Sequence, residues 1–511
     1  MDIFSTNFST IDWVIVGVYL LGAVVVGVIA NRYIHSVSAY LVGGGESGTS
    51  LNVATYIGTG LGLVTLMYAS MESFSMGFAY VTVAVIGAVV GVILGSTGLV
   101  IHRLRELNLL TIPEYFEKRY SRRVRIVGGV ICALAGILNM GLFPKMGATF
   151  ITYVTGFGGS SGHENTINLI TTLLIVLVLV YTVLGGMVSV IVTDYIQFVV
   201  LSVGMAIGVY FVLTHPDLGW TTITDTMASQ RGERMFNPVA EGGYGWTWIV
   251  FMFMLFLSAG ICWAPEASRA LTAKNSTVAK RTFLFAAPGQ FVRLAIPALW
   301  ACAAFCLVAQ NAELMAHFFP DGMGGAARHA EQAMPLVIGK IMPAGLLGIL
   351  VAGLMAAFMS THDSYLLCWS SVISRDIIAP LKRTPPDERA QIKTTRISIV
   401  CIGVFLMIWG VWYKLPDSVW SYMAITGTIY LSGAAPALIG GVYWKRASSA
   451  GAMAALFGGL VSVCGLFREQ ANEALGWNIT NPQLGLFNFL FCAVLLVGVS
   501  LAVPDKKPVG E

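Results

Sequence analysis

Charged residues are scarce in this chain of 511 residues: Asp, Glu, Lys and Arg make up 11% of it, against about 25% in a typical soluble domain. Hydrophobic residues make up 56%, and the mean hydropathy is +0.76. A soluble fold of this length could not bury so much apolar surface, and a disordered chain would show the opposite balance. The composition therefore predicts an all-α polytopic membrane protein.

Several functional motifs are also missing. There is no Walker motif for ATP, and the eight cysteines lie in apolar stretches without the spacing of a metal site. His362, Asp363 and Ser364 are neighbours on one predicted helix, so they cannot converge on one reacting atom. We therefore expect no enzymatic activity. The basic run from Lys118 to Arg125 suits lipid headgroups better than nucleic acid, so we also expect no nucleic-acid partner.

Thirteen apolar segments are long enough to cross a bilayer, which takes about 20 residues. They are predicted at residues 11–30, 51–71, 78–101, 124–155, 165–184, 187–213, 246–267, 282–309, 335–378, 395–413, 419–443, 448–467 and 484–503. The ninth is too long for one span. Its start, from Met334 to Pro343, is predicted to form an interfacial helix before the span proper.

The basic residues predict the orientation in the membrane. Of the 30 Lys and Arg residues, 22 fall in one set of alternate loops and the C-terminal segment, and five fall on the opposite side. Cytoplasmic loops carry the excess of Lys and Arg. We therefore expect a multi-pass protein of the cell membrane with its N-terminus outside and its C-terminus in the cytoplasm.

Two predicted spans contain helix-breaking residues at mid-depth. Glycines 58, 60 and 62 favour unwinding of the second span, and the segment Ser258–Pro265 favours a break in the seventh. Backbone groups freed inside a bilayer need partners, so a broken span indicates a cation or solute site; a glycine face that only packs closely is the alternative. Because the breaks lie five spans apart, they predict two inverted repeats.

Polar residues also interrupt the ninth span. Ser360 and Thr361 offer two hydroxyl oxygens from one helix turn, and Ala357 offers a carbonyl, a ligand set that suits a small alkali cation. The alternative is that both hydroxyls bond to their own helix. Asp194 and Asp363 are costly in a span unless they are paired or face water. Arg293 lies about 18 Å into the membrane and should face a cavity or an acid.

Six short motifs, in order along the chain, resemble those of the sodium:solute symporter family. They are Tyr40–Gly45, Ala54–Gly60, Thr111–Tyr120, Gly185-Gly186 with Val192–Gln197, Arg269–Lys274, and Ala357–Ser364 followed by Asp376. The resemblance covers almost the whole of residues 1–511 and implies a single LeuT-type transporter domain. The core would hold repeats at 51–213 and 246–443, with an extra helix at 11–30 before them and two at 448–503 after them.

The resemblance also implies sodium-driven uptake of a small organic solute by alternating access. Its main sodium ligands would be the carbonyls of Ala54, Ile57 and Ala357 with the hydroxyls of Ser360 and Thr361. A second cation or proton site, found in some members, would use Asp194, Ser360, Asp363 and Ser364. In this chain Asp363 stands where some members have a serine, which leaves the number of sodium ions open.

For the solute, the resemblance implies contacts with Tyr56, Gly58, Leu61, Asn139 and Arg293. Gly60 and Leu61 replace a polar pair that sugar carriers use, which argues against a sugar. A carboxylate-bearing or amide-bearing solute could use Arg293. Two alternatives stay open: a proton-coupled symporter using Asp194 and Asp363, and a solute sensor without transport. The sequence does not decide between a monomer and a homo-oligomer.

Overall fold

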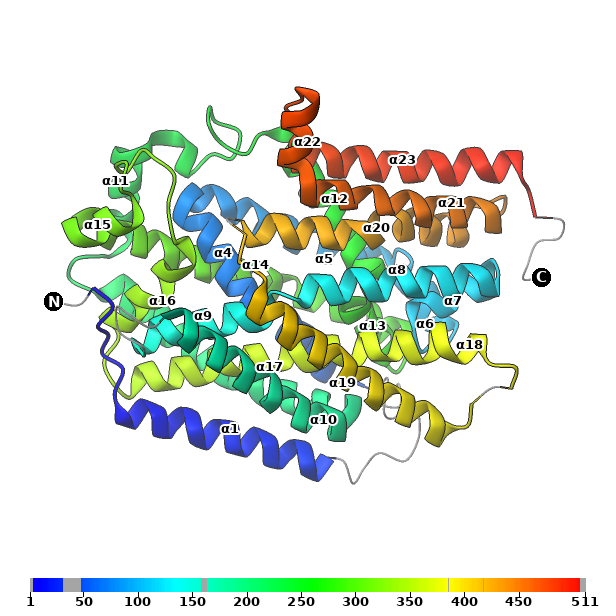
Figure 1. The fold of residues 1–511 in the computed structure, drawn as a ribbon, viewed down its shortest axis with the longest axis horizontal. Helices are drawn as coiled ribbons and strands as arrows, with labels where there is room; N and C mark the ends of the chain where they lie inside the picture. The colour runs from blue at the N-terminus through cyan, green and yellow to red at the C-terminus, as the bar shows by residue number, and fades with distance from the viewer. Residues whose placement is uncertain (1–2, 31–46, 158–162, 385, 417, 506–511) are drawn as a thin grey trace.

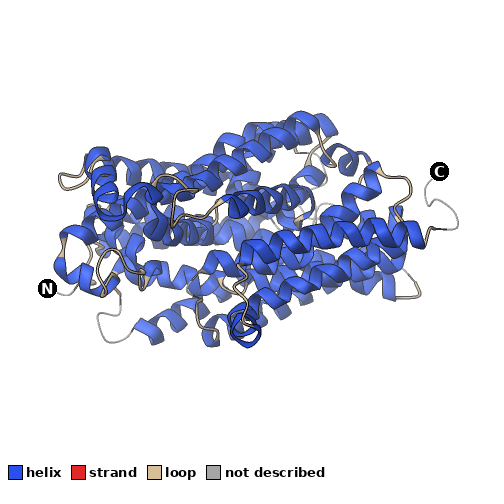
Figure 2. Cartoon of the chain, turned by 90° about the horizontal axis from the view of Figure 1, so that it is seen from above, coloured by secondary structure: helices blue, strands red, loops and turns tan. Residues whose placement is uncertain are grey.

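The computed structural model describes residues 3–30, 47–157, 163–384, 386–416 and 418–505, which form an elongated bundle of helices (Figures 1 and 2). The described residues form helices and loops but no named strand; Ser47 and Ala273 form one isolated parallel bridge. The motif Tyr40–Gly45, Arg32, Lys506 and Lys507 lie outside the described residues.

The first half of the described chain contributes the helices up to residue 235, and α1 among them runs along the long axis of the bundle (Figure 1). They are α1 (Thr10–Ala30), α3 (Thr49–Gly60), α4 (Leu63–Met76), the 3₁₀ helix η3 (Gly77–Tyr80), α5 (Val81–Thr97), α6 (Ile101–Glu106), α7 (Ile112–Arg119), α8 (Arg122–Met140), α9 (Phe143–Thr155), α10 (His163–Thr214), α11 (Trp220–Arg231) and the 3₁₀ helix η5 (Gly232–Met235).

The helices of the second half pack among those of the first. They are α12 (Trp246–Cys262), α13 (Ala264–Thr272), α14 (Ser276–Gln310), α15 (Ala312–Phe318), α16 (Ala330–Ile341), α17 (Leu346–Val372), the π-helix η6 (Ile373–Ile378), α18 (Ala379–Leu381), α19 (Glu388–Trp412), α20 (Val419–Tyr443), α21 (Ser449–Gly459), the 3₁₀ helix η7 (Leu460–Phe467), α22 (Arg468–Leu475) and α23 (Asn481–Ala502).

Length and composition identify the membrane spans. Within the described ranges nine helical segments are long and apolar enough to cross a membrane, or ten if the bent pair α12–α13 counts as one span. Exposed apolar side chains such as Leu21 on α1 and Leu490 on α23 mark surfaces that face lipid. The predicted all-helical polytopic class is confirmed.

Two details differ from a simple count of spans. The long ninth segment divides as predicted into two helices, α16 and α17. By contrast, the spans predicted at 165–184 and 187–213 belong to α10, a single run of 52 residues. A straight helix of this length would extend about 78 Å, which exceeds a bilayer core of about 30 Å. One straight crossing is therefore excluded.

The helices at the periphery and those in the centre have different neighbours. In Figure 1, α1 lies along one edge of the bundle and α23 along the opposite edge. Between them, α17 packs against α10, α19, α8 and α3. Of the residues in its apolar, membrane-spanning stretch, 89% are buried inside the bundle. The polar residues of α17 are therefore shielded from lipid, and they face other helices.

Candidate sodium and solute sites

Two spans are broken where the sequence predicted interruptions. The first break separates α3 from α4 at Leu61 and Gly62, whose backbone leaves the helical region with ψ values of 51° and 154°. The second separates α12 from α13 at Trp263, where the axis bends by 44°. Both breaks expose peptide groups inside the bundle, where side chains of other helices can bind them.

The first break is in direct contact with α17. The hydroxyl of Thr361 donates a hydrogen bond to the carbonyl of Thr59 over 3.2 Å. A Cβ atom added at Gly62 would lie only 2.2 Å from that hydroxyl oxygen, so this approach requires glycine. The hydroxyl of Ser360 donates to a carboxylate oxygen of Asp194 on α10. Both hydroxyls of the predicted cation motif therefore contact other elements and do not bond to their own helix.

The five predicted sodium ligands lie on α3 and α17, two helices that pack against each other. Each is at most 8% exposed: Ala54 and Ile57 on α3, and Ala357, Ser360 and Thr361 on α17. The carbonyl of Ile57 also accepts a hydrogen bond from the backbone N–H of Leu61 at the break. The donor set consists of neutral oxygens, which suits a small cation of single charge.

Asp194 belongs to a buried polar cluster beside this contact. Nη2 of Arg269, on α13, lies 3.2 Å from Asp194 Oδ2, donates to Ser364 Oγ over 2.9 Å and also donates to the hydroxyl of Thr59. The side-chain amide of Asn52 donates a hydrogen bond to the carbonyl of Arg269 over 2.8 Å. Arg269 and Asp194 are fully buried. The guanidinium of Arg269 therefore contacts Asp194 and Ser364, two residues of the predicted second cation site. Asp363, the residue before Ser364, is fully buried.

The burial of Arg269 corrects one expectation. With the seventh span predicted to end at residue 267, Arg269 was expected to lie in the loop that follows it. The chain instead forms α13, which bends by 44° and carries Arg269 into the bundle against Asp194. An available signal was the buried acid itself, since an intramembrane carboxylate needs a partner.

A cavity of about 90 Å³ lies between α4, α8, α12, α13, α14, α17 and α20. Aromatic rings form much of its wall, and three polar side chains also face it. The aromatic residues are Tyr68, Phe256, Trp263, Tyr365 and Trp420, and the polar ones are Asn139, Glu266 and Arg293. Aromatic walls with a few polar groups are typical of a small-molecule site.

Arg293 connects this cavity to the first break. Its Nη1 donates to the carbonyl of Gly60 over 3.1 Å, and its guanidinium lies 5.9 Å from the ring centre of Phe256. The side chain is only 5% exposed, and its Nε has no hydrogen-bond partner. A Cβ atom at Gly60 would lie 2.5 Å from Nη1, so glycine at this position makes room for the guanidinium.

The other predicted solute residues lie in different places. Asn139 lines the cavity, but its amide donates to the carbonyl of Met423 and the hydroxyl of Thr426. Tyr56 packs on Phe283, with ring centres 4.9 Å apart. Gly58 faces the Asp194 carbonyl, and Leu61 is buried at the break. Of the five predicted solute residues, only Asn139 and Arg293 line this cavity.

Sequence reasoning missed most of the aromatic wall. Tyr68, Tyr365 and Trp420 come from three separate spans, and in an apolar span an aromatic residue has no distinctive pattern. Trp263 offered a signal, because it lies inside the predicted break of the seventh span. Glu266 offered another, because it is an acid at the end of an apolar segment.

A polytopic helical bundle in which two broken spans flank a cavity with buried charges is the architecture of a secondary transporter. Comparison with known proteins places this transporter in a family. The model of the Sodium:solute symporter family matches residues 40–459. The chain therefore belongs to this family, and it is a sodium-coupled solute symporter rather than an enzyme.

Individual relatives are distant. The chain is 25% identical over 475 residues to the sodium/sialic acid symporter SiaT of Proteus mirabilis, covering 89% of each protein. It is 26% identical over 402 residues to the human high affinity choline transporter 1, covering 75% of this chain and 64% of that protein. It is also similar to the mouse sodium/glucose cotransporter 4, at 25% identity over 448 residues with 77% and 60% covered.

Solved structures show the same fold. A substrate-bound, outward-open Na⁺-coupled sialic acid symporter matches with a TM-score of 0.80 at 20% identity, over 98% of this chain and all of that one. The transporter MhsT in complex with L-phenylalanine matches with a TM-score of 0.53 at 13% identity, over 89% and 99% of the two chains. The predicted family and LeuT-type fold are confirmed, and sodium is the co-transported ion rather than a cofactor.

Proposed function

We propose that this symporter carries a small solute with an anionic group and a cationic or hydrogen-bond-donating group, bound between Arg293 and Glu266. The observation that carries this proposal is that both charged side chains line one cavity walled by aromatic rings. The names of the relatives mention sialic acid, choline and glucose, so sequence similarity does not identify the solute of this protein. The charges of the cavity therefore provide the more specific guide.

The electrostatics favour a solute with two opposite poles. A buried charge is costly unless a partner of opposite charge or a hydrogen bond compensates it. The guanidinium of Arg293 has one hydrogen-bond acceptor, the Gly60 carbonyl, and its Nε is left for another. A carboxylate on the solute would complete this set, and an ammonium or donor group would face Glu266. The aromatic walls would bind the apolar part of the solute and stabilise its cation.

We place the coupling sodium at the oxygens of Ala54, Ile57, Ala357, Ser360 and Thr361. Two consecutive peptide groups join this position to the solute cavity. The Thr59 carbonyl accepts from Thr361, and the next carbonyl, of Gly60, accepts from Arg293. Sodium bound between α3 and α17 would therefore order the backbone segment that orients Arg293. This shared element gives each ligand an effect on the affinity of the other.

We further propose that one sodium ion moves in each cycle. The Arg269 guanidinium contacts Asp194, Ser364 and Thr59, so it supplies a fixed positive charge where the second cation was predicted. A mobile cation at this position would have to displace a buried ion pair. Sodium-dependent transport by the wild type should give a Hill coefficient near one, and a coefficient near two would contradict this proposal.

We also propose that the protein resides in the cell membrane, imports its solute, and has its N-terminus outside and its C-terminus in the cytoplasm. The bias of basic residues supports this orientation. The two ends of the described chain also lie at opposite ends of the bundle (Figure 1). Labelling of single cysteines, introduced at residues 233 and 383, from either side of an intact membrane would test it.

The solute proposal is tested by a thermal-shift screen of the purified protein. Zwitterions, carboxylates, amines and neutral sugars are compared in sodium and in potassium at equal ionic strength. We expect zwitterions to raise Tm in sodium only, and to have little effect on the Arg293→Gln variant. Arg281→Gln is the matched control, because Arg281 is exposed on the same helix. A sodium-dependent shift with neutral sugars alone would overturn the proposed solute class.

A further inference from the structure

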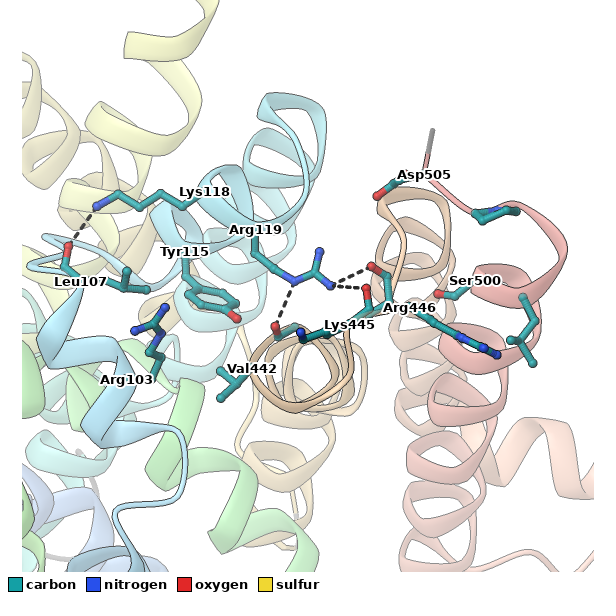
Figure 3. Close-up of a pocket in the computed structure, with 14 residues that line it drawn as sticks. Arg103, Leu107, Tyr115, Lys118, Arg119, Val442, Lys445, Arg446, Ser500 and Asp505 are labelled. Carbon is teal, nitrogen blue, oxygen red and sulfur yellow. Dashed lines mark hydrogen bonds between the residues drawn. The ribbon is translucent and has the colours of Figure 1, made fainter. Parts of the chain in front are cut away.

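A large cavity lies at the end of the bundle where α6, α7 and the end of α23 meet (Figures 1 and 3). Its volume is about 860 Å³. The walls come from α6, α7, the end of α20, the link between α20 and α21, and the end of α23. None of the residues proposed for sodium or for the solute contributes to it, so any ligand of this cavity is distinct from both.

The lining of this cavity is strongly positive. It contains five cationic side chains: Arg103, Lys118, Arg119, Lys445 and Arg446. The single acid in the lining is Asp505, whose Oδ2 already accepts hydrogen bonds from the backbone N–H and the hydroxyl of Ser449. The acid therefore caps the start of α21, and the five cations outnumber it.

The cations of the lining differ in their availability. Lys445 and Arg446 are exposed, and their side chains make no hydrogen bond or ion pair with the described residues. Lys118 donates to the Leu107 carbonyl over 2.9 Å, and Arg103 lies 3.4 Å from Glu106. Two cations on the α20–α21 link are thus available for a ligand.

Arg119 and Tyr115 fix the geometry around those two cations. Nε of Arg119 donates to the Gly441 carbonyl over 2.9 Å, and its Nη2 donates to the Ala447 carbonyl over 3.0 Å. These bonds hold the link that carries Lys445 and Arg446 (Figure 3). Burial raises the pKa of Tyr115 to about 12, so its hydroxyl is a neutral donor at physiological pH.

Exposed apolar side chains lie among the lining residues of the cavity or next to them in the chain. Leu501, Tyr443 and Val503 are 56%, 61% and 54% exposed, and they lie at the ends of α23 and α20. Exposed apolar residues at the end of a membrane span face the interfacial region of the bilayer. A ligand that fills the cavity therefore meets cations inside and lipid at the opening.

We propose that this cavity binds the phosphate-bearing headgroup of an anionic membrane lipid, with the acyl chains lying along the end of α23. Lys445 and Arg446 would bind the phosphate by charge-assisted hydrogen bonds, assisted by the hydroxyl of Tyr115. Because the walls include α7 and α23, a bound headgroup ties the last helix to the core of the bundle. The lipid would stabilise that contact, and it takes no part in sodium or solute binding.

The test measures lipid affinity in neutral detergent by the change in intrinsic tryptophan fluorescence. Wild type is titrated with short-chain phosphatidylglycerol, short-chain phosphatidylcholine and inorganic phosphate. The variant Lys445→Gln/Arg446→Gln removes the two available cations. The matched control Arg281→Gln/Arg389→Gln removes two exposed cations that do not line this cavity.

We expect saturable binding of phosphatidylglycerol, and the Lys445→Gln/Arg446→Gln variant should bind it about 30-fold more weakly. The control pair should bind it as wild type does, and both variants should retain sodium-dependent solute binding. Equal losses in both double variants would overturn the proposal, because they would show attraction by diffuse surface charge. Inorganic phosphate that binds as tightly as phosphatidylglycerol would also overturn it, by identifying a soluble anion as the ligand.

Discussion

Two arginines are buried among the spans, and their surroundings differ. Arg269 is fully buried, and its Nη2 contacts a carboxylate and two hydroxyls. Arg293 is nearly as buried, but its guanidinium donates to one carbonyl, faces a cavity and has an Nε without a partner. The same residue type thus completes a polar cluster in one place and offers charge to a ligand in the other.

This difference follows from the helix that carries each arginine. Arg269 lies on α13, just after the second break, where the bend directs it toward α10 and α17. Arg293 lies in the middle of α14, and it reaches the first break only because residue 60 is glycine. Each arginine is thus linked to a broken span. The predictions below distinguish the role in stability from the role in binding.

The largest expected effect is on stability, from Arg269→Gln. This change leaves the Asp194 carboxylate buried without its cation, and breaking a buried ion pair costs about 3–5 kcal/mol. We expect a markedly lower Tm for the purified protein. Asp194→Asn combined with Arg269→Gln should recover part of the loss, because no buried charge then remains unpaired. A single variant as stable as wild type would contradict the proposed ion pair.

The next effect concerns sodium. Ser360→Ala combined with Thr361→Ala removes two of the five proposed ligands while leaving folding and membrane insertion largely intact. Sodium affinity should fall by about 100-fold or more, because losing even an outer partner of a metal ligand costs about 10- to 100-fold. The measurement is sodium-induced thermal stabilisation. The control is Ser370→Ala with Ser371→Ala, whose hydroxyls bond to their own helix. Unchanged sodium affinity would rule out the proposed site.

Arg293→Gln should affect the solute more than sodium. A hydrogen bond to a charged group contributes about 1.5–3 kcal/mol, so solute affinity should fall by about 10- to 100-fold. Sodium affinity measured without solute should change far less, and Tm should stay close to that of wild type. Equal losses of sodium and solute affinity would assign Arg293 a structural role like that of Arg269.

The smallest effect is expected from Gly60→Ala. The added methyl group would lie 2.5 Å from Nη1 of Arg293, which must then move from the Gly60 carbonyl. The guanidinium is the end of a flexible side chain, so we expect about a fivefold loss of solute affinity, at the low end of the cost of overpacking. Combining this change with Arg293→Gln should add nothing further. Additive losses would show that Gly60 acts without Arg293.

The sequence predicted the breaks well because their cause is local. Glycines 58, 60 and 62 weaken one helix, and Pro265 ends another, whatever surrounds them. The predicted division between α16 and α17 likewise followed from segment length. The boundary between the fifth and sixth spans was less accurate, since α10 keeps its helical hydrogen bonds where two spans were predicted. Apolar composition alone does not mark where one span ends and the next begins when the helix continues between them.

The sequence by itself determined the class of protein, the positions of both breaks and the pair of hydroxyls on α17 from which the sodium proposal starts. Composition, glycine spacing and adjacent hydroxyls can all be read from the chain without knowing which distant residues meet. Only the tertiary structure decided that Arg269 meets Asp194, and that Arg293 and Glu266 share a cavity with rings from four other helices. These pairings join residues tens to hundreds of positions apart. They depend on how far α13 bends and how closely α14 approaches Gly60, which only the packing of the whole bundle sets.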